Sequence, residues 1–299
     1  MDKKLSGKIV SDVLYKELNE YLSAKNDTRL RLVDISIGED FGAKMYAEMK
    51  KRTLENKLNY DVNSLHLNQA SLNELLCEIN KINEDSTYDG LMLQLPLPKT
   101  LRTYERTILD TISKAKDVDC LTSCNLGDLM VGNNNLLPCT PLGIITLLKV
   151  YGVPLNGKNI VIINRSNIIG KPLEQLFLQE DATITLAHSK TKNLKELVKR
   201  ADIVVAALNK QEFITEEFIK EEAIIIDVGV HKNSEGKTVG DVDFDSVYEK
   251  CSYITPPTGG VGPMTICMLG YNVAKARYGK EIDKVLNQGI EKAKVLIKN

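Results

Sequence analysis

Short apolar runs alternate with longer amphipathic segments over the first hundred residues of the chain. The spacing of apolar positions predicts helices over 8–24, 43–57 and 71–83, and strands over 31–37, 60–67 and 90–95. Strands that alternate with helices in this way are typical of an α/β fold built on a parallel sheet.

A second alternating series begins at Gly157, after a loop-rich stretch over 115–137 and a helix that ends near Tyr151. It predicts strands over 159–163, 182–186, 202–207 and 223–228, and a later helix over 265–277. Two such series predict two α/β domains, with an active-site cleft between them.

Composition narrows the possible partners and compartments. The 299 residues carry 39 basic and 40 acidic side chains, a net charge of −1, which favours neither nucleic acid nor an anionic membrane as a partner. The N-terminus lacks the apolar run of a signal peptide, and the longest apolar stretches are strand-sized. Six scattered cysteines and three histidines show no metal-ligand spacing. We therefore expect reduced thiols, no metal and a cytoplasmic protein that does not enter a membrane.

The first strand of the second series is followed directly by a polar turn and a helix. The strand 160–163 leads into Asn164, Arg165 and Ser166, and Pro172 suits the first turn of the helix. A strand–turn–helix of this kind presents backbone amides to a dinucleotide phosphate. The Arg165 guanidinium can fork onto phosphate oxygens, which favours NADP over NAD. An ordinary surface arginine in a loop is the alternative, and this segment alone does not separate the two.

Tyr46 and Lys50 are four residues apart on a predicted helix and therefore share one face. A lysine held beside a tyrosine in a closed site can exchange protons near neutral pH, whereas the alternative is an amphipathic surface pair. Gln94 follows a predicted strand, and Asp117 and Asp119 open the loop-rich stretch. The Tyr-x-x-x-Lys spacing also occurs in short-chain dehydrogenases. There it follows the dinucleotide unit, whereas here it precedes that unit by more than one hundred residues.

Six segments carry a family resemblance when they are taken together and in order. They are Tyr46-x-x-x-Lys50, 89–98, 116–119, 138–143, Arg165-Ser166 with Gly170-Lys171-Pro172, and 259–265. In this order they resemble the bifunctional methylenetetrahydrofolate dehydrogenase/cyclohydrolase family as far as about residue 277.

The resemblance implies an enzyme with two α/β domains. A folate-binding catalytic domain over 1–137 would be completed by 265–299, and a Rossmann-like NADP-binding domain would span 138–264. The family oxidises 5,10-methylenetetrahydrofolate to the 5,10-methenyl cation with NADP and then hydrolyses the cation to 10-formyltetrahydrofolate. The resemblance further implies a cytoplasmic homodimer in one-carbon metabolism that supplies purine biosynthesis.

The resemblance also assigns roles to residues on the folate side. Lys50 would be the catalytic lysine in both steps, and Tyr46 would pack against the folate ring and position Lys50. Gln94 would hydrogen-bond Lys50 and tune it, and Asp119 would anchor the pterin. Gly259 and Gly260 would lie in a loop beside the folate.

On the cofactor side, the resemblance places Arg165 and Ser189 on the 2′-phosphate, with His188 close by. The full set of implied cofactor contacts is Asn164, Arg165, Ser166, His188, Ser189 and Val230.

The chain departs from the family pattern at several of these sites. Ala43 replaces a serine, Cys120, Asn164 and Asn209 replace glycines, and Pro257-Thr258 replaces Val-Pro. Three alternatives stay open: a single-activity member, a non-catalytic folate- or nucleotide-binding protein on this scaffold, and an unrelated amino- or hydroxy-acid dehydrogenase. The presence of Lys50 and Gln94 argues against a protein that only binds its ligand. Arg165 and Ser189 argue against a member that is only a hydrolase. The Tyr46–Lys50 helix, which lies upstream of the dinucleotide unit, argues against the unrelated dehydrogenase.

Overall fold

The computed structural model describes residues 2–25, 29–38 and 41–298. The chain divides into two compact units. The Lys50 unit comprises Leu14–Cys139 and Ile266–Gly289, and the Arg165 unit comprises Met1–Val13, Thr140–Thr265 and Ile290–Asn299. The functional domain boundaries expected from the sequence stay a prediction.

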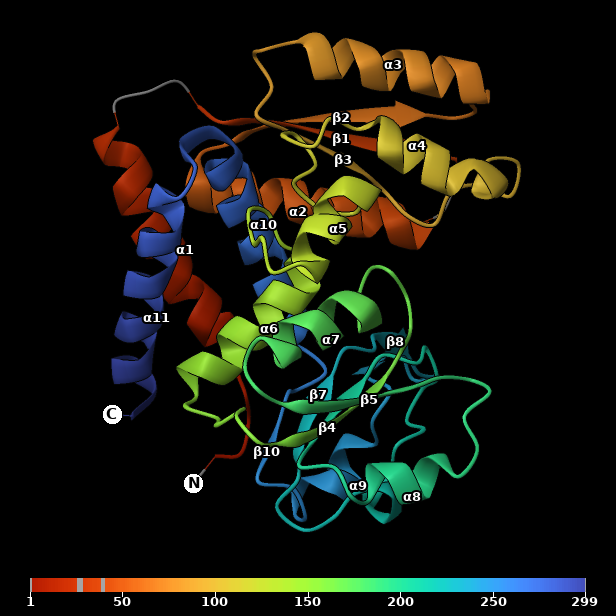
Figure 1. Ribbon diagram of the computed structural model, residues 1–299, viewed down its shortest axis with the longest axis vertical. Helices are drawn as coiled ribbons and strands as arrows, with labels where there is room; N and C mark the ends of the chain where they lie inside the picture. The colour runs from red at the N-terminus through yellow and green to blue at the C-terminus, as the bar shows by residue number, and fades with distance from the viewer. Residues whose placement is uncertain (1, 26–28, 39–40, 299) are drawn as a thin grey trace. The chain divides into compact units, whose positions relative to one another are not determined.

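The Lys50 unit is built on a parallel three-stranded sheet with the order β2-β1-β3 (Figure 1). Its strands are β1 (Arg31–Ile37), β2 (Asp61–Leu67) and β3 (Gly90–Leu93). Its helices are α2 (Phe41–Leu58), α3 (Leu72–Glu84), α4 (Glu105–Thr111) and α5 (Ser123–Met130). Three long helices, α1 (Gly7–Ala24), α10 (Val261–Tyr278) and α11 (Glu281–Lys298), continue from one unit into the other.

The two faces of this sheet have different coverings, and the difference decides where the site lies. Val33 and Ile35 of β1 pack with Leu91 and Leu93 of β3 against α3 and α4, which form one buried apolar cluster. Side chains alternate along a strand, so the intervening residues point to the opposite face. Figure 1 shows α2 on that opposite side of the sheet.

The Arg165 unit contains a parallel five-stranded sheet with the order β10-β7-β6-β4-β5. The strands are β4 (Asn159–Ile163), β5 (Thr183–Ala187), β6 (Ile203–Ala206), β7 (Ile224–Asp227) and β10 (Tyr253–Ile254). The helices are α6 (Cys139–Val150), α7 (Gly170–Leu178), α8 (Leu194–Val198) and α9 (Phe244–Tyr248). The apolar cluster on one face joins the strands to α8 and α9, and in Figure 1 α6 and α7 lie on the other side. Helices on both faces of a parallel sheet make a doubly wound fold.

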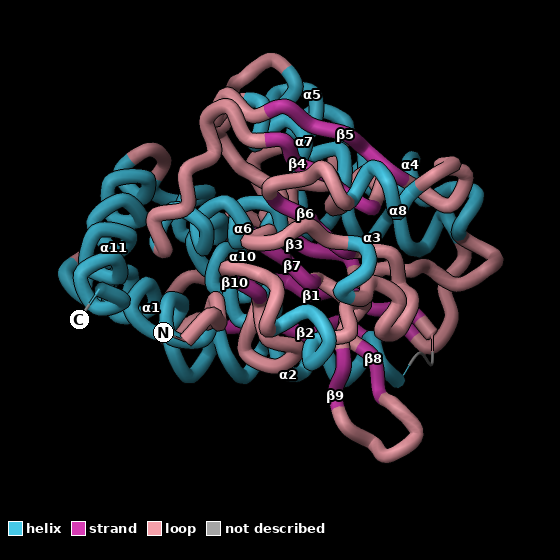
Figure 2. Tube along the Cα trace, turned by 90° about the horizontal axis from the view of Figure 1, so that it is seen from below, coloured by secondary structure: helices cyan, strands magenta, loops and turns pink. Residues whose placement is uncertain are grey.

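A short antiparallel hairpin extends from this unit. It consists of β8 (His231–Lys232) and β9 (Thr238–Val239), and Figure 2 shows it projecting beyond the sheet. Among the helices that the structure describes, none has both the length and the apolar character needed to cross a membrane.

The predicted helices and strands are confirmed with small shifts at their ends, and so is the two-domain α/β fold. The stretch over 115–137 is loop-rich as expected, and it contains one short helix, α5, that the sequence pattern did not indicate. The Thr122 side chain accepts a hydrogen bond from Asn125 N at 3.2 Å and begins this helix. Helix α5 is only 8 residues long, which leaves too little sequence to show a helical repeat.

Candidate active site

Alternation along β1 and β3 brings three side chains to the face of the sheet that α2 covers. Asp34 of β1 is paired in register with Met92 of β3, and both lie on the face opposite the apolar cluster. Gln94, two residues after Met92, follows the same alternation just beyond the strand end. Helix α2 brings Lys50 to this face, with Lys50 Nζ 3.9 Å from Met92 Sδ.

The Lys50 ammonium is buried and held by specific partners. The residue is 6% exposed, and its Nζ donates a hydrogen bond to Gln94 Oε1 at 3.0 Å. The Tyr46 ring, one helical turn earlier, has its centroid 4.8 Å from Nζ, within the range of a cation–π contact. The Tyr46–Lys50 pair is therefore directed inward and is not the surface pair that the sequence left open.

Gln94 is held on its other side by Asp34. Gln94 Nε2 donates to both carboxylate oxygens of Asp34 at 2.8 Å, and both residues are buried. The chain Asp34–Gln94–Lys50 thus joins a carboxylate, an amide and an ammonium through hydrogen bonds.

Asp119 and Cys139 complete the electrostatic surroundings. Burial raises the pKa of the Asp119 carboxyl, and the nearby Lys50 charge acts against that rise. Burial also raises the pKa of the Tyr46 hydroxyl, and the Asp119 charge adds to that effect. The pKa of the Cys139 thiol is raised by burial and by Asp119, so this cysteine is a neutral neighbour and not a nucleophile. The predicted residues Tyr46, Lys50, Gln94 and Asp119 are therefore brought together.

Such a cluster can hold and transfer a proton. Lys50 Nζ is the one ammonium in it, and Gln94 and Tyr46 restrict where that ammonium can point. A positioned lysine that is shielded from water is suited to general acid–base chemistry.

The Arg165 unit contains a pocket of about 540 Å³ at the carboxyl ends of β4, β5 and β6. Ligands of doubly wound sheets bind at this edge. The pocket is lined by Ile163, Asn164, Arg165, Ser166, His188, Ser189, Thr191, Leu194, Ala207, Leu208, Lys210 and Phe213. Five of the six predicted cofactor residues thus share one pocket. Val230 does not line it and is 68% exposed, so its role stays a prediction.

Asn164 organises the turn that begins this pocket. Its Oδ1 accepts hydrogen bonds from Ser166 N at 2.7 Å and Gly170 N at 3.1 Å, and its Nδ2 donates to Ala207 O at 2.6 Å. A Cβ at Gly170 would lie 2.2 Å from Asn164 O, so only glycine allows α7 to begin this close to the turn. The asparagine side chain therefore ties the turn to Ala207, the residue that follows β6, which a glycine at this position cannot do.

A buried carboxylate holds the opposite wall. Asp241 accepts hydrogen bonds from Leu208 N at 2.7 Å, Asn209 N at 3.2 Å and Lys210 N at 2.7 Å, and from His231 Nε2 at 2.8 Å. Asn209 has φ 55°, in the left-handed region, where asparagine is among the better-tolerated residues. The replacement of a glycine at this position is therefore compatible with the backbone.

The pocket has the groups that a phosphorylated dinucleotide requires. Arg165 and Lys210 supply cationic donors, Ser166 and Ser189 supply hydroxyls, and Leu208 and Phe213 supply apolar surface. These residues fit NADP.

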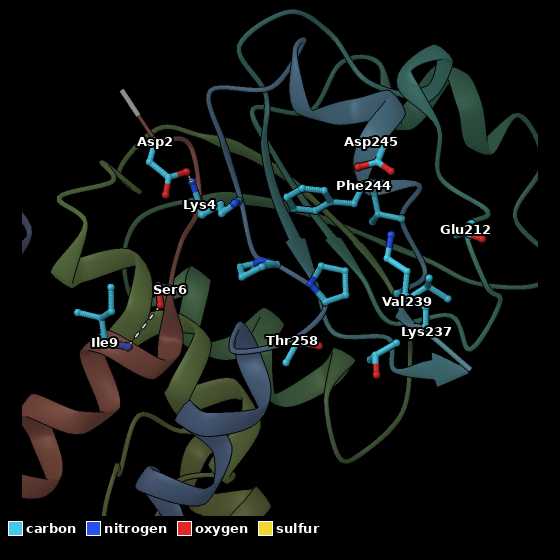
Figure 3. A pocket seen from close by; sticks show the side chains of 15 residues that line it. Asp2, Lys4, Ser6, Ile9, Glu212, Lys237, Val239, Phe244, Asp245 and Thr258 are labelled. Atoms are coloured by element: carbon cyan, nitrogen blue, oxygen red, sulfur yellow. Dashed lines mark hydrogen bonds between the residues drawn. The ribbon is translucent and has the colours of Figure 1, made fainter. Parts of the chain in front are cut away.

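A second pocket, also about 540 Å³, lies beside the segment that leads to Gly259 and Gly260 (Figure 3). It is lined by residues of 2–9, Glu212, 237–245 and 256–258, with lysines and acids mixed along its walls. Thr258, one of the departures from the family pattern, lies at this pocket. Gly259 and Gly260 belong to the Arg165 unit, and their place beside the substrate stays a prediction.

Two buried acids were missed by sequence reasoning. Asp34 interrupts the otherwise apolar buried run 32–35, and that polar residue among apolar ones was the available signal. Asp241 carries no such signal, because its partners are backbone amides of a distant loop. Cys120 has φ 58°, which explains why a glycine suits its position. The Ala43 side chain lies outside the described part of the structure.

Within the described ranges, no three His, Cys, Asp or Glu side chains form a group that could hold a metal ion.

Comparison with known proteins extends over both units. Residues 5–119 match the family model of the tetrahydrofolate dehydrogenase/cyclohydrolase catalytic domain, and residues 138–280 match that of its NAD(P)-binding domain. The chain is 44% identical over 279 residues to the bifunctional protein FolD of Clostridium perfringens (strain SM101 / Type A), which covers 92% of this chain and 99% of that one.

Two solved structures of dehydrogenase/cyclohydrolase enzymes are also similar to this chain. The bifunctional FolD dehydrogenase/cyclohydrolase of Campylobacter jejuni has a TM-score of 0.87 and 38% identity, covering 92% of this chain and 98% of that one. The Trypanosoma brucei FolD structure, complexed with NADP cofactor and inhibitor, has a TM-score of 0.86 and 31% identity, covering 92% and 97%. The chain belongs to the tetrahydrofolate dehydrogenase/cyclohydrolase family.

Proposed function

We propose that this protein oxidises 5,10-methylenetetrahydrofolate with NADP and hydrolyses the resulting 5,10-methenyl cation to 10-formyltetrahydrofolate. The observation that carries the proposal is the buried Lys50, hydrogen-bonded to Gln94 and covered by the Tyr46 ring, in a chain of this family. Asp119 is the anchor for the pterin, where a carboxylate can pair with ring N–H donors.

The oxidation requires position more than proton transfer. The bridging methylene loses a hydride and becomes a cation that the two adjacent folate nitrogens stabilise. Tyr46 offers a ring face to the folate, and Gln94 and Lys50 orient the reacting carbon. NADP, when bound, supplies the hydride acceptor.

The hydrolysis requires a proton donor. Water adds to the bridging carbon, the bond from that carbon to N5 breaks, and N5 takes up a proton. One proton of the water therefore remains on N5, and the other is released. Lys50 Nζ is the group in the site that can move a proton between these atoms, and Gln94 holds it in position.

The residues that would hold NADP line the pocket of the Arg165 unit. Arg165 and Ser189 would bind the 2′-phosphate, with His188 beside them, and Asn164 and Ser166 would present the turn to the pyrophosphate. As the family resemblance implies, Val230 would also contact the cofactor, and the Gly259–Gly260 loop would lie beside the folate.

We further propose that the enzyme acts as a cytoplasmic homodimer, as the resemblance implies. Its product would serve one-carbon metabolism, including purine biosynthesis.

The proposal can be tested by mixing purified protein with 5,10-methylenetetrahydrofolate and NADP and following the methenyl absorbance. We expect the absorbance to rise as NADPH forms. It should then decay faster than methenyltetrahydrofolate hydrolyses in the absence of protein. In a second mixture without NADP, added methenyltetrahydrofolate should also decay faster than the control.

Each other outcome corresponds to a different protein. A rise without accelerated decay would indicate a dehydrogenase alone, and accelerated decay without a rise would indicate a cyclohydrolase alone. No change in either mixture would contradict the proposed function and favour a binding protein.

A further inference from the structure

Strand β1 carries a single buried carboxylate on the face that α2 covers. Its residues Leu32, Val33, Asp34 and Ile35 are all buried, and Asp34 is 3% exposed. A carboxylate in an apolar sheet is costly to bury unless it is hydrogen-bonded. The hydrogen bonds that Asp34 accepts therefore indicate what it does there.

Asp34 determines which way the Gln94 amide faces. Its two oxygens are each 2.8 Å from Gln94 Nε2, and an ionised carboxylate can only accept hydrogen bonds. The amide NH₂ must therefore face Asp34, which leaves Gln94 Oε1 to face Lys50 Nζ at 3.0 Å. The opposite orientation would set the amide oxygen against the carboxylate and the NH₂ against the ammonium.

Among the described residues, no other charged group near Lys50 takes over the hydrogen bonds that Asp34 makes to Gln94. Asp119 faces Tyr46 and Cys139 and interacts with the same lysine, but its carboxyl is not part of the hydrogen bonds to Gln94. Burial raises the pKa of Asp34, whereas the Lys50 charge and the Gln94 hydrogen bond lower it. The hydrogen-bonded path from Asp34 to Lys50 thus runs through the Gln94 amide, and the two charges also attract each other directly.

We propose that Asp34 is a positioning residue for Lys50, which acts by fixing the orientation of the Gln94 amide. The proposal rests on the proposed role of Lys50. Asp34 hydrogen-bonds Gln94 and not the lysine, so it is not itself a proton carrier.

The variants Asp34→Leu and Asp34→Asn test whether Asp34 orients the Gln94 amide or only fills space in the core. Leucine removes every acceptor, and we expect the kcat for methenyltetrahydrofolate hydrolysis to fall about 10- to 100-fold with little change in KM. Asparagine keeps one acceptor for Gln94 Nε2, so Asp34→Asn should recover most of kcat. Asp61→Asn, on the exposed side of β2, is the matched control and should retain wild-type turnover.

A double-mutant cycle with Gln94→Ala tests whether Asp34 acts on Lys50 through the Gln94 amide. If Asp34 acts through the amide, Asp34→Leu should have little further effect once Gln94 is alanine. Additive losses, or wild-type kcat and pH profile in a folded Asp34→Leu protein, would overturn the proposal.

Lys50→Met and the wild type, assayed in parallel, separate this proposal from the proposed function. If the Lys50→Met protein is inactive and the Asp34→Leu protein is fully active, the role of Asp34 is rejected and the proposed function stands. An inactive wild type, or a fully active Lys50→Met, would reject the proposed function and the role of Asp34 with it.

Discussion

At the scale of single residues, the site shows how a buried charge is stabilised. Burying an ammonium is unfavourable unless partners replace its water, and Lys50 has the Gln94 amide, the Tyr46 ring and nearby carboxylates to do so. Asp34 is likewise paired with Gln94. The cluster is therefore held in one arrangement before any substrate arrives.

Arg165 allows a sharp prediction about cofactor choice. It is exposed and lines the pocket of the Arg165 unit, and its proposed partner is the 2′-phosphate that NAD lacks. A charge-assisted hydrogen bond of this kind contributes about 1.5–3 kcal/mol. Arg165→Ala should therefore weaken NADP binding about 10- to 100-fold and leave NAD binding unchanged, as measured by calorimetry.

Lys171→Ala is the matched control for Arg165→Ala. Lys171 is also cationic and exposed, but it bonds Asn167 and does not line the pocket. Equal losses for NADP and NAD in Arg165→Ala, or an equal effect of Lys171→Ala, would contradict the role of Arg165.

The sequence supports some residue assignments better than others. A spacing of four predicts that Tyr46 and Lys50 share a helix face, and the strand end predicts where Gln94 projects. Asp34 could not be assigned in this way, because its role depends on a residue 60 positions away along the chain. Local pattern carries no information about such a pair.

At the scale of elements, most strands and helices could be predicted because their apolar periodicity is strong. The exceptions are short, such as α5, whose residues are too few to repeat. The β8–β9 hairpin has only two residues in each strand, so alternation cannot be recognised there.

The last residue of β7, Asp227, carries a buried carboxylate whose titration affects the stability of the fold. Asp227 accepts hydrogen bonds from the backbone amides of Gly229, Asp241 and Val242, yet burial raises its pKa to about 7. The Asp241 carboxylate adds to the rise. The strand end thus places two acids next to each other, and Asp241 hydrogen-bonds the loop over 208–210 that borders the pocket of the Arg165 unit.

This pKa predicts how stability changes with pH. The folded protein keeps a proton on Asp227 up to about pH 7, whereas the unfolded chain releases it near 3.8. The free energy of unfolding should therefore fall as pH rises from 4 to 7, by on the order of 4 kcal/mol at most from this group. Urea unfolding of Asp227→Asn across that range should show a weaker fall than the wild type.

Asp245→Asn, an exposed acid of the same unit, should keep the wild-type slope. An Asp227→Asn protein with the full wild-type slope would show that another group titrates.

At the scale of the whole molecule, each unit contains one kind of chemistry. Lys50, Gln94, Tyr46 and Asp119 lie within the Lys50 unit, and the pocket lined by Arg165 and Ser189 lies within the Arg165 unit. Substitutions in one cluster should therefore leave the binding chemistry of the other intact. The family could be inferred from six short motifs in order, whereas oligomeric state has no comparable signal in the sequence.

The most direct test of this account is the turnover of 5,10-methenyltetrahydrofolate by Lys50→Met, measured together with its NADP affinity. Methionine keeps the length and apolar stem of lysine and removes the proton-carrying Nζ, so folding should be preserved. We expect cyclohydrolase turnover to fall about 10²- to 10⁴-fold while NADP affinity stays at the wild-type value. Near-wild-type turnover in the folded variant would contradict the assignment of Lys50 as the centre of the site.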